Sequence, residues 1–190
     1  NFIKELLIDS QHRLWIGTES GVTVYNLTTK EFKNFNTQNK LSNNNVQNII
    51  EGPGGNIWVA TLNGLNKIEK DTNNVLQIKL DDEDPDATGS DFISTMFVDS
   101  RKNIWLGHDF GRLSKFNPET HKFVRYNTVD HLYYTGITED DKGNLWLSSW
   151  GGGVIKFDMQ TGVFQIYTHN PDDDRSLSYG TTWTVFIDRS

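Results

Sequence analysis

The residues of this chain best suited to binding chemistry are aromatic and charged side chains in its second half. A flat aromatic ring can stack on the apolar face of a sugar ring, while carboxylate, guanidinium and imidazole groups bond to the sugar hydroxyls. The candidates for a ligand site of this kind are His108, Asp109, Phe110, Arg112, His131, Tyr133, Tyr134, Trp150, Tyr179 and Trp183. They are dispersed along the sequence, so only a fold that gathers separate loops can bring them together.

Metal and catalytic chemistry find little support in the sequence. The acidic residues at 81–86 could ligate Ca²⁺, but they lack the alternating spacing and the glycine of an EF-hand loop, so a solvated loop is the better interpretation. The same holds for the three aspartates at 172–174. The five histidines are not spaced as paired metal ligands, and the absence of cysteine excludes thiolate chemistry. We therefore expect no catalytic residue, no metal and no cofactor.

A repeated tryptophan indicates how the fold gathers its loops. The strings RLWIGT, NIWVAT, NIWLGH and NLWLSS contain Trp15, Trp58, Trp105 and Trp146, at spacings of 43, 47 and 41 residues. A period in the forties with one aromatic anchor per copy is typical of a β-propeller blade of four strands. Each tryptophan would bury roughly 150–250 Å² between neighbouring blades.

The residues around each tryptophan predict the four strands of a blade. A short apolar run and a turn rich in Gly, Asn, Asp and Ser precede the tryptophan, which predicts a hairpin. A glycine follows six residues after every tryptophan, and a strand with alternating apolar and polar residues begins there. A second turn and a short last strand complete each copy. The last strands are predicted at 32–35, 75–78, 123–126 and 164–167.

The predicted fold class is all-β, a partial β-propeller of about four four-stranded antiparallel blades in one domain over residues 1–190. The repeats span approximately residues 1–41, 42–90, 91–131 and 132–180, and residues 181–190 start a fifth. One extra strand is expected at 183–188, because TVFIDRS matches ELLIDSQ near the start of the chain. Such an arc leaves apolar blade faces and an open strand edge, so we expect further propeller blades or self-association as partners.

Charge and hydropathy exclude two classes of partner. The formal net charge is −7, the isoelectric point is about 5.1, and lysine and arginine form no cluster. Binding to nucleic acid or to anionic lipid is therefore disfavoured. No apolar run is long enough to span a bilayer, so we expect no membrane contact in this segment.

Propeller topology predicts that the candidate residues share one rim. The loops between second and third strands open on the same side as the loops that lead into the next blade. Trp150 is the leading candidate, because the other copies hold Glu19, Leu62 and Asp109 at its position. The competing interpretation is that a Tyr or Trp at the start of a first strand packs between blades.

The chain resembles the two-component regulator propeller family over its whole length. The strings that carry the resemblance are IDSQHRLWIGTESGVTVYN at 8–26 and EDDKGNLWLSSWGGGVIKFDMQTGVFQIYTHNPDDDRSLS at 139–178. The resemblance implies the periplasmic sensor region of a Bacteroides-type hybrid two-component system, a family whose members recognise varied glycans or their breakdown products. It transfers no ligand-binding residue by position.

We therefore expect a non-catalytic sensor module that binds a carbohydrate-derived ligand, such as an oligosaccharide, and relays binding to a kinase. Two alternatives remain open. A propeller enzyme of the streptogramin-lyase or lactonase type would need His108, Asp109 and a second His or Glu to converge within about 3–4 Å. A purely structural protein–protein interaction propeller would show a rim without a concave pocket.

Overall fold

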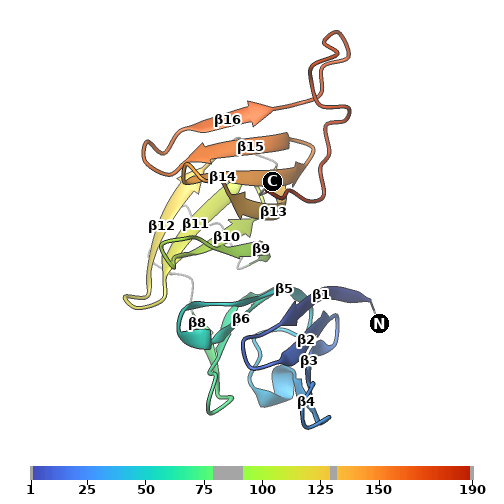
Figure 1. The fold of residues 1–190 in the computed structure, drawn as a ribbon, viewed down its shortest axis with the longest axis vertical. Coiled ribbons are helices and arrows are strands. Elements are labelled where there is room, and N and C mark those ends of the chain that lie inside the picture. The colour runs from blue at the N-terminus through green and yellow to red at the C-terminus, as the bar shows by residue number, and fades with distance from the viewer. Residues whose placement is uncertain (1, 79–91, 129–131, 189–190) are drawn as a thin grey trace. The chain divides into compact units, whose positions relative to one another are not determined.

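The computed structural model describes residues 2–78, 92–128 and 132–188, and in these ranges the chain forms sixteen strands (Figure 1). They are arranged as four antiparallel sheets, each built from four strands that are consecutive in the sequence. This is the architecture of a partial β-propeller, which the repeat predicts. In the described ranges no helix is long and apolar enough to cross a membrane.

The strand bounds follow the repeat closely. The first sheet contains β1 (Ile3–Ile8), β2 (Arg13–Thr18), β3 (Gly21–Asn26) and β4 (Phe32–Phe35). The second contains β5 (Val46–Glu51), β6 (Ile57–Thr61), β7 (Gly64–Ile68) and β8 (Val75–Ile78). The third contains β9 (Ile93–Val98), β10 (Ile104–His108), β11 (Arg112–Asn117) and β12 (Lys122–Asn127). The fourth contains β13 (Tyr133–Glu139), β14 (Asn144–Trp150), β15 (Gly153–Asp158) and β16 (Phe164–Tyr167). Within the described residues, the only helical segments are the short 3₁₀ turns η1 (Thr37–Asn39) and η2 (Pro53–Gly55).

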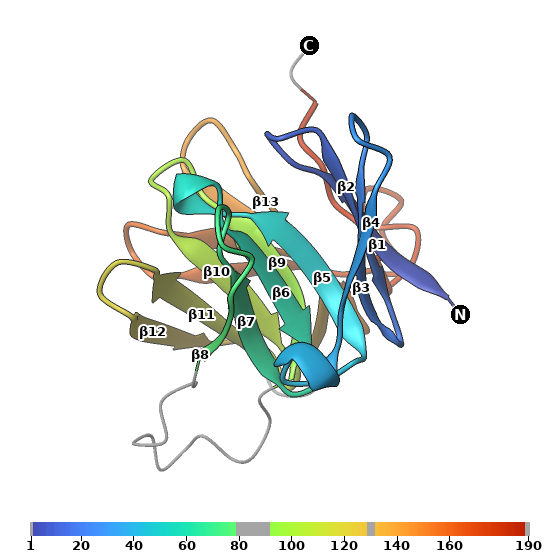
Figure 2. The same ribbon diagram turned by 90° about the horizontal axis from the view of Figure 1, so that it is seen from below.

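The chain divides into two compact units, Asn1–Ser94 and Thr95–Ser190, with the boundary inside β9. In the first unit, β5 packs against β1 and β2, and Figure 2 shows the two sheets side by side. In the second unit, β13 packs against β10. Each unit has its own apolar core, built from the facing sides of its two sheets.

Within each unit, the repeat tryptophan of the first sheet is part of the core shared with the second sheet. Trp105, for example, contacts Phe157 of the fourth sheet with ring centroids 5.6 Å apart. Trp15, Trp58 and Trp105 are almost completely buried, as the repeat predicts. Trp146 is only half-buried, because no further sheet covers its side of the fourth sheet among the described residues.

The expected strand at 183–188 is not formed. A first strand pairs with the second strand of its own blade, as β1 does with β2, and no such partner exists for 183–188 among the described residues. Without a ladder to satisfy its N–H and C=O groups, the segment does not form a strand. Its start is held against the fourth sheet, since Thr182 N donates to Ser149 O at 3.0 Å and Thr135 Oγ1 donates to Thr182 O at 2.8 Å.

Candidate ligand-binding site

One edge of the second unit carries a set of aromatic and charged side chains that we call the aromatic rim. Its members come from the β10–β11 turn, from the paired ends of β13 and β14, and from the segment that follows β16. The residues of the aromatic rim are Asp109, Phe110, Arg112, Tyr133, Trp150 and Trp183.

Hydrogen bonds fix the β10–β11 turn against the entry to β13. Gly111 N donates to Leu132 O at 2.7 Å, immediately before β13 begins. The Gly111 carbonyl accepts from Thr128 Oγ1 at 2.6 Å and from the Tyr134 hydroxyl at 3.1 Å. Asp109 and Phe110 are therefore held close to Tyr133, the first residue of β13.

The other end of the rim is an aromatic pair. Tyr133 is paired with Trp150 in the β13–β14 ladder, which places the two residues side by side at the end of the sheet. The Trp150 and Trp183 rings have centroids 5.8 Å apart and are tilted by 40°. Their side chains are 58% and 67% exposed, which is far more than the repeat tryptophans. Large exposed aromatic surface of this kind is typical of a binding site.

Charges at the rim are partly compensated. Arg112 Nη2 lies 3.3 Å from Asp109 Oδ1, and the pair is about four-fifths buried. Arg112 Nε is buried and has no hydrogen-bond partner among the described residues. Burial raises the pKa of the Tyr133 hydroxyl, and the nearby Asp109 carboxylate raises it further, so Tyr133 is a neutral hydroxyl that can donate.

Phe110 has an unusual backbone conformation for a bulky residue. Its φ is +56°, in the left-handed region, although its side chain is 56% exposed and gains little from packing. This conformation costs a non-glycine residue about 1–2 kcal/mol. The corresponding residue of the fourth blade is Gly151, with φ +86°. Backbone strain that is not offset by packing is found most often at functional sites.

Two sequence candidates turn inward and are structural. His108 is buried, and its Nε2 lies 3.0 Å from Ser114 Oγ. It occupies the position of Thr18, whose hydroxyl bonds across the equivalent turn to Gly21 O at 3.0 Å. Tyr134 of β13 is fully buried where β13 packs against β10, and burial raises the pKa of its hydroxyl to about 12. We therefore remove His108 and Tyr134 from the ligand-binding candidates.

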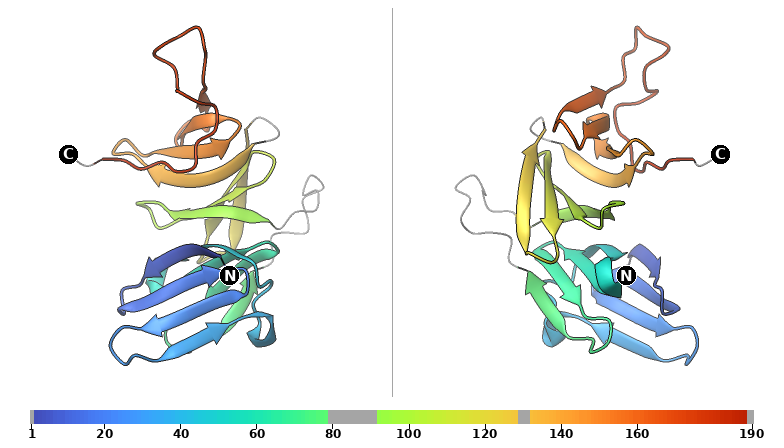
Figure 3. Two further views of the ribbon diagram at one scale, coloured as in Figure 1. Left: turned by 90° about the vertical axis from the view of Figure 1, so that its right-hand side faces the viewer. Right: turned by 60° about the vertical axis from the view of Figure 1, so that its left-hand side comes forward.

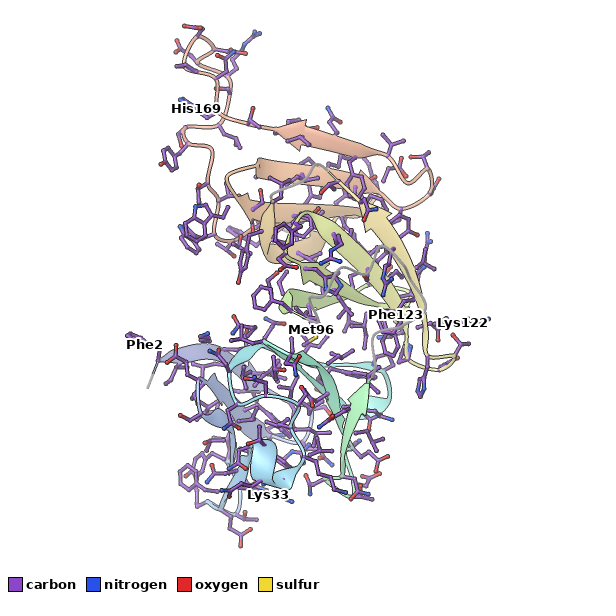
Figure 4. The ribbon with its side chains drawn as sticks, turned by 180° about the vertical axis from the view of Figure 1, so that it is seen from behind. Phe2, Lys33, Met96, Lys122, Phe123 and His169 are labelled. Atoms are coloured by element: carbon purple, nitrogen blue, oxygen red, sulfur yellow. The ribbon has the colours of Figure 1, made fainter. Side chains whose placement is uncertain are left out.

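The remaining candidates are placed as follows. Tyr179 is exposed, in the loop that extends away from β16 and returns at Gly180, visible in both views of Figure 3. His169 stands near the base of this loop (Figure 4), and its Nδ1 lies 2.7 Å from Leu177 O. His131 and the acidic run at 81–86 lie outside the described residues. In the part of the chain that is described, no three His, Cys, Asp or Glu side chains are grouped to hold a metal ion.

Two threonines that the sequence does not single out organise the rim. Thr128 donates to the Gly111 carbonyl, as described above, and Thr182 likewise bonds to a glycine carbonyl in the fourth blade. Thr182 Oγ1 donates to Gly153 O at 2.6 Å and accepts from Ser149 N at 3.0 Å. Thr128 directly follows β12, whereas Thr182 directly precedes the segment 183–188, so their positions in the sequence do not mark them as equivalent.

Comparisons with known proteins agree with this fold. The family profile "Two component regulator propeller" matches residues 40–63. The chain is 26% identical over 192 aligned residues to "Histidine kinase P4" of Formosa agariphila, covering 91% of this chain and 14% of that protein.

Solved structures are similar in shape at low sequence identity. The extracellular domain of a putative hybrid two component system from B. thetaiotaomicron superposes with a TM-score of 0.87 at 23% identity, over 98% of this chain and 25% of that domain. Virginiamycin B lyase from Staphylococcus aureus gives a TM-score of 0.71 at 14% identity, over 90% of this chain and 56% of the lyase. At these identities the likeness shows the fold alone. The chain spans about a quarter of the solved domain and a smaller share of the kinase.

Proposed function

We propose that this chain is a non-catalytic, extracytoplasmic sensor module of a hybrid two-component signalling protein, a proposal supported by the two-component regulator propeller profile at residues 40–63 and by the similarity to a histidine kinase. Its similarity to a histidine kinase and to an extracellular domain of a hybrid system supports this role and a periplasmic location. The lyase likeness supports a second function less well, since its identity and TM-score are both lower than those of the extracellular domain.

The ligand we propose is carbohydrate-derived and binds at the aromatic rim. The observation that carries this proposal is the pair of exposed indoles, Trp150 and Trp183, on a backbone fixed by hydrogen bonds. Fixed aromatic surface is suited to the apolar face of a pyranose ring, because stacking then orders no flexible side chain. The Asp109 carboxylate and the Tyr133 hydroxyl supply polar groups beside it for sugar hydroxyls.

The spacing of the two indoles defines how a sugar can lie on them. A ring inserted between two aromatic faces needs about 7–8 Å, which is two van der Waals separations. The centroids of Trp150 and Trp183 are only 5.8 Å apart, so the pair cannot clamp a ring between them. The ligand must lie across both indoles, which favours an oligosaccharide over a single sugar.

The same geometry suggests how binding is relayed. Trp150 belongs to β14, while Trp183 belongs to the segment that follows the fourth sheet. A ligand that covers both rings binds best when that segment is docked on the sheet. A difference in affinity between docked and undocked states is what a ligand needs to shift a conformational equilibrium.

A glycan array followed by calorimetry tests the proposal. The protein should bind an oligosaccharide, and Trp150→Ala should weaken that binding at least tenfold. Phe32→Ala, which removes an exposed aromatic ring from the first sheet, should leave it unchanged. Binding that survives Trp150→Ala unaltered would place the ligand elsewhere and refute the rim as the site.

A further inference from the structure

We propose that the blades are organised as two pairs, each held together by a Ser–Glu clamp and each opening as a cooperative unit of its own. The first pair consists of the first and second sheets, and the second pair consists of the third and fourth sheets. The clamp is a bidentate bond between a serine in the first turn of one blade and a glutamate on the next blade. Both clamps lie outside the aromatic rim and do not depend on its ligand.

Each clamp uses the two carboxylate oxygens of a glutamate at the end of a first strand. Glu51, the last residue of β5, accepts the backbone N–H of Ser10 at 2.8 Å with Oε2 and the Ser10 hydroxyl with Oε1. Glu139, the last residue of β13, accepts the N–H of Ser100 at 2.6 Å with Oε2 and its hydroxyl at 2.9 Å with Oε1. Hydrogen bonds to a charged acceptor are stronger than neutral ones, so each clamp joins two consecutive blades firmly.

The repeat places the two clamp partners at fixed positions, so the sequence shows which consecutive blades can form a clamp. The serine directly follows the residue that stands six positions before the repeat tryptophan, and the glutamate directly precedes the same residue of the next blade. For the second and third blades, these positions hold Pro53 and Val98. Proline has neither an N–H nor a hydroxyl, and valine has no side-chain acceptor, so these two residues cannot form the clamp.

The next step along the chain also lacks both partners. The fourth blade has Asp141 at the serine position, and an ionised carboxylate cannot donate a hydrogen bond. Ile187 stands at the glutamate position of the segment that follows the fourth blade. Serine and glutamate are therefore present together for the first and second blades and for the third and fourth, and absent together at the other two steps. This alternation divides the blades into pairs.

The apolar packing of the described residues follows the same division. One buried cluster joins Trp15 of the first sheet to Ile49 of the second, and another joins Trp105 of the third sheet to Leu147 of the fourth. Each pair thus has its own core as well as its own clamp, which are the conditions for separate cooperative opening. A ligand that binds one pair alone then stabilises that pair and leaves the other unchanged.

Hydrogen exchange at the backbone amides of β6 and β10 tests the pairs one at a time, because these strands belong to different units. Glu51→Ala removes the first clamp and should accelerate exchange in β6 about fivefold, while exchange in β10 changes less than twofold. Glu139→Ala removes the second clamp and should have the reverse effect. Ser10→Ala, which removes only the hydroxyl bond, should accelerate β6 less than Glu51→Ala does.

Two exposed glutamates in turns of the same units provide matched controls. Glu19→Ala and Glu119→Ala each remove a carboxylate that lies outside the clamps, so each should change exchange in β6 and β10 less than twofold. Equal acceleration of both strands by one clamp variant would show that the chain opens as a single cooperative unit. Clamp variants that exchange no faster than the controls would show that the clamps do not hold the pairs together. Either result would overturn the proposal.

Discussion

The indole Nε1 of Trp146 donates a hydrogen bond to Asp140 Oδ2 at 2.8 Å. The same carboxylate accepts the backbone N–H groups of Lys142 and Asn144, at 3.0 and 2.8 Å. One side chain thus closes the β13–β14 turn and orients the tryptophan. The same bond joins Asp9 to Trp15 at 2.7 Å and Asp99 to Trp105 at 2.9 Å.

Removal of this carboxylate in a buried blade should be costly. Asp99→Ala leaves the buried indole N–H of Trp105 and the N–H groups of the turn without their acceptor. We expect a loss of about 2–3 kcal/mol in the free energy of unfolding, because buried donors lose a charged acceptor. Denaturant unfolding measures it. Asp71→Ala, in an exposed turn, is the control, and an equal effect of both variants would contradict the assigned role.

The same bonds predict a dependence of stability on acid. Partial burial favours the neutral form of Asp140, but bonds from Trp146, Asn144 and the turn amides outweigh it and lower its pKa to about 2. The pKa of Asp9 is also lowered, since its bonds from Trp15 and Arg13 outweigh burial. A folded pKa below the unfolded value of about 3.9 stabilises the fold above pH 4.

This stabilisation from Asp140 should be lost as the pH falls from about 4 to about 2. Unfolding measured across this range should show a smaller loss for Asp140→Asn than for the unsubstituted protein, because the amide does not titrate. Asp141→Asn, at the neighbouring exposed carboxyl, is the matched control. Identical acid profiles for the protein and Asp140→Asn would refute the prediction.

The repeat tryptophans should dominate stability, and the rim tryptophan should not. Trp58→Ala and Trp105→Ala each remove a buried indole and should cost about 3–5 kcal/mol by leaving a cavity. Trp150→Ala should cost less than about 1 kcal/mol, since its ring is largely exposed. Thermal and denaturant unfolding compare the three. A cost below 1 kcal/mol at both buried positions would show that the repeat does not pack as described.

Most of the fold could be predicted from the sequence because each blade repeats the same pattern of residues. A tryptophan, a turn and a glycine recur in each copy, so the four alignments reinforce one another. The strand expected at 183–188 failed because a strand also needs a partner, which a local match cannot provide. The bond from the indole to the aspartate in the first, third and fourth blades is visible in the sequence only as a constant spacing of six residues.

The rim was predicted in outline but not in the direction of its side chains. Successive residues of a strand point to opposite faces, so only one of Tyr133 and Tyr134 can face the rim. The sequence does not say which, and the structure buries Tyr134.

Phe110 should lower the stability of the fold while contributing to ligand binding. Phe110→Gly replaces a strained left-handed residue with one that adopts φ +56° freely, so stability should be unchanged or higher by up to about 1 kcal/mol. If Phe110 contacts the ligand, the same variant should bind the oligosaccharide several-fold more weakly. Unfolding and calorimetry on one preparation measure both effects. A variant that is clearly less stable would show that Phe110 is a packing residue.

Self-association of the chain is a proposal, and a measurement of its mass in solution tests it. β1 exposes Ile3, Leu6 and Ile8, and among the described residues only β2 pairs with it. We propose that copies of the chain associate through this strand, since exposed apolar strands invite association. Light scattering should show a mass that rises with concentration, and Leu6→Lys should reduce the rise. A constant monomeric mass at high concentration would contradict self-association.

The most direct test of the proposed ligand site uses the six tryptophans as reporters. Each indole N–H gives one signal in a ¹H–¹⁵N spectrum, and single Trp→Phe variants assign all six. Titration with the oligosaccharide found on the array should move the signals of Trp150 and Trp183 and leave those of Trp15 and Trp58 in place. Saturable binding with Trp150 and Trp183 unmoved would contradict the aromatic rim as the ligand site.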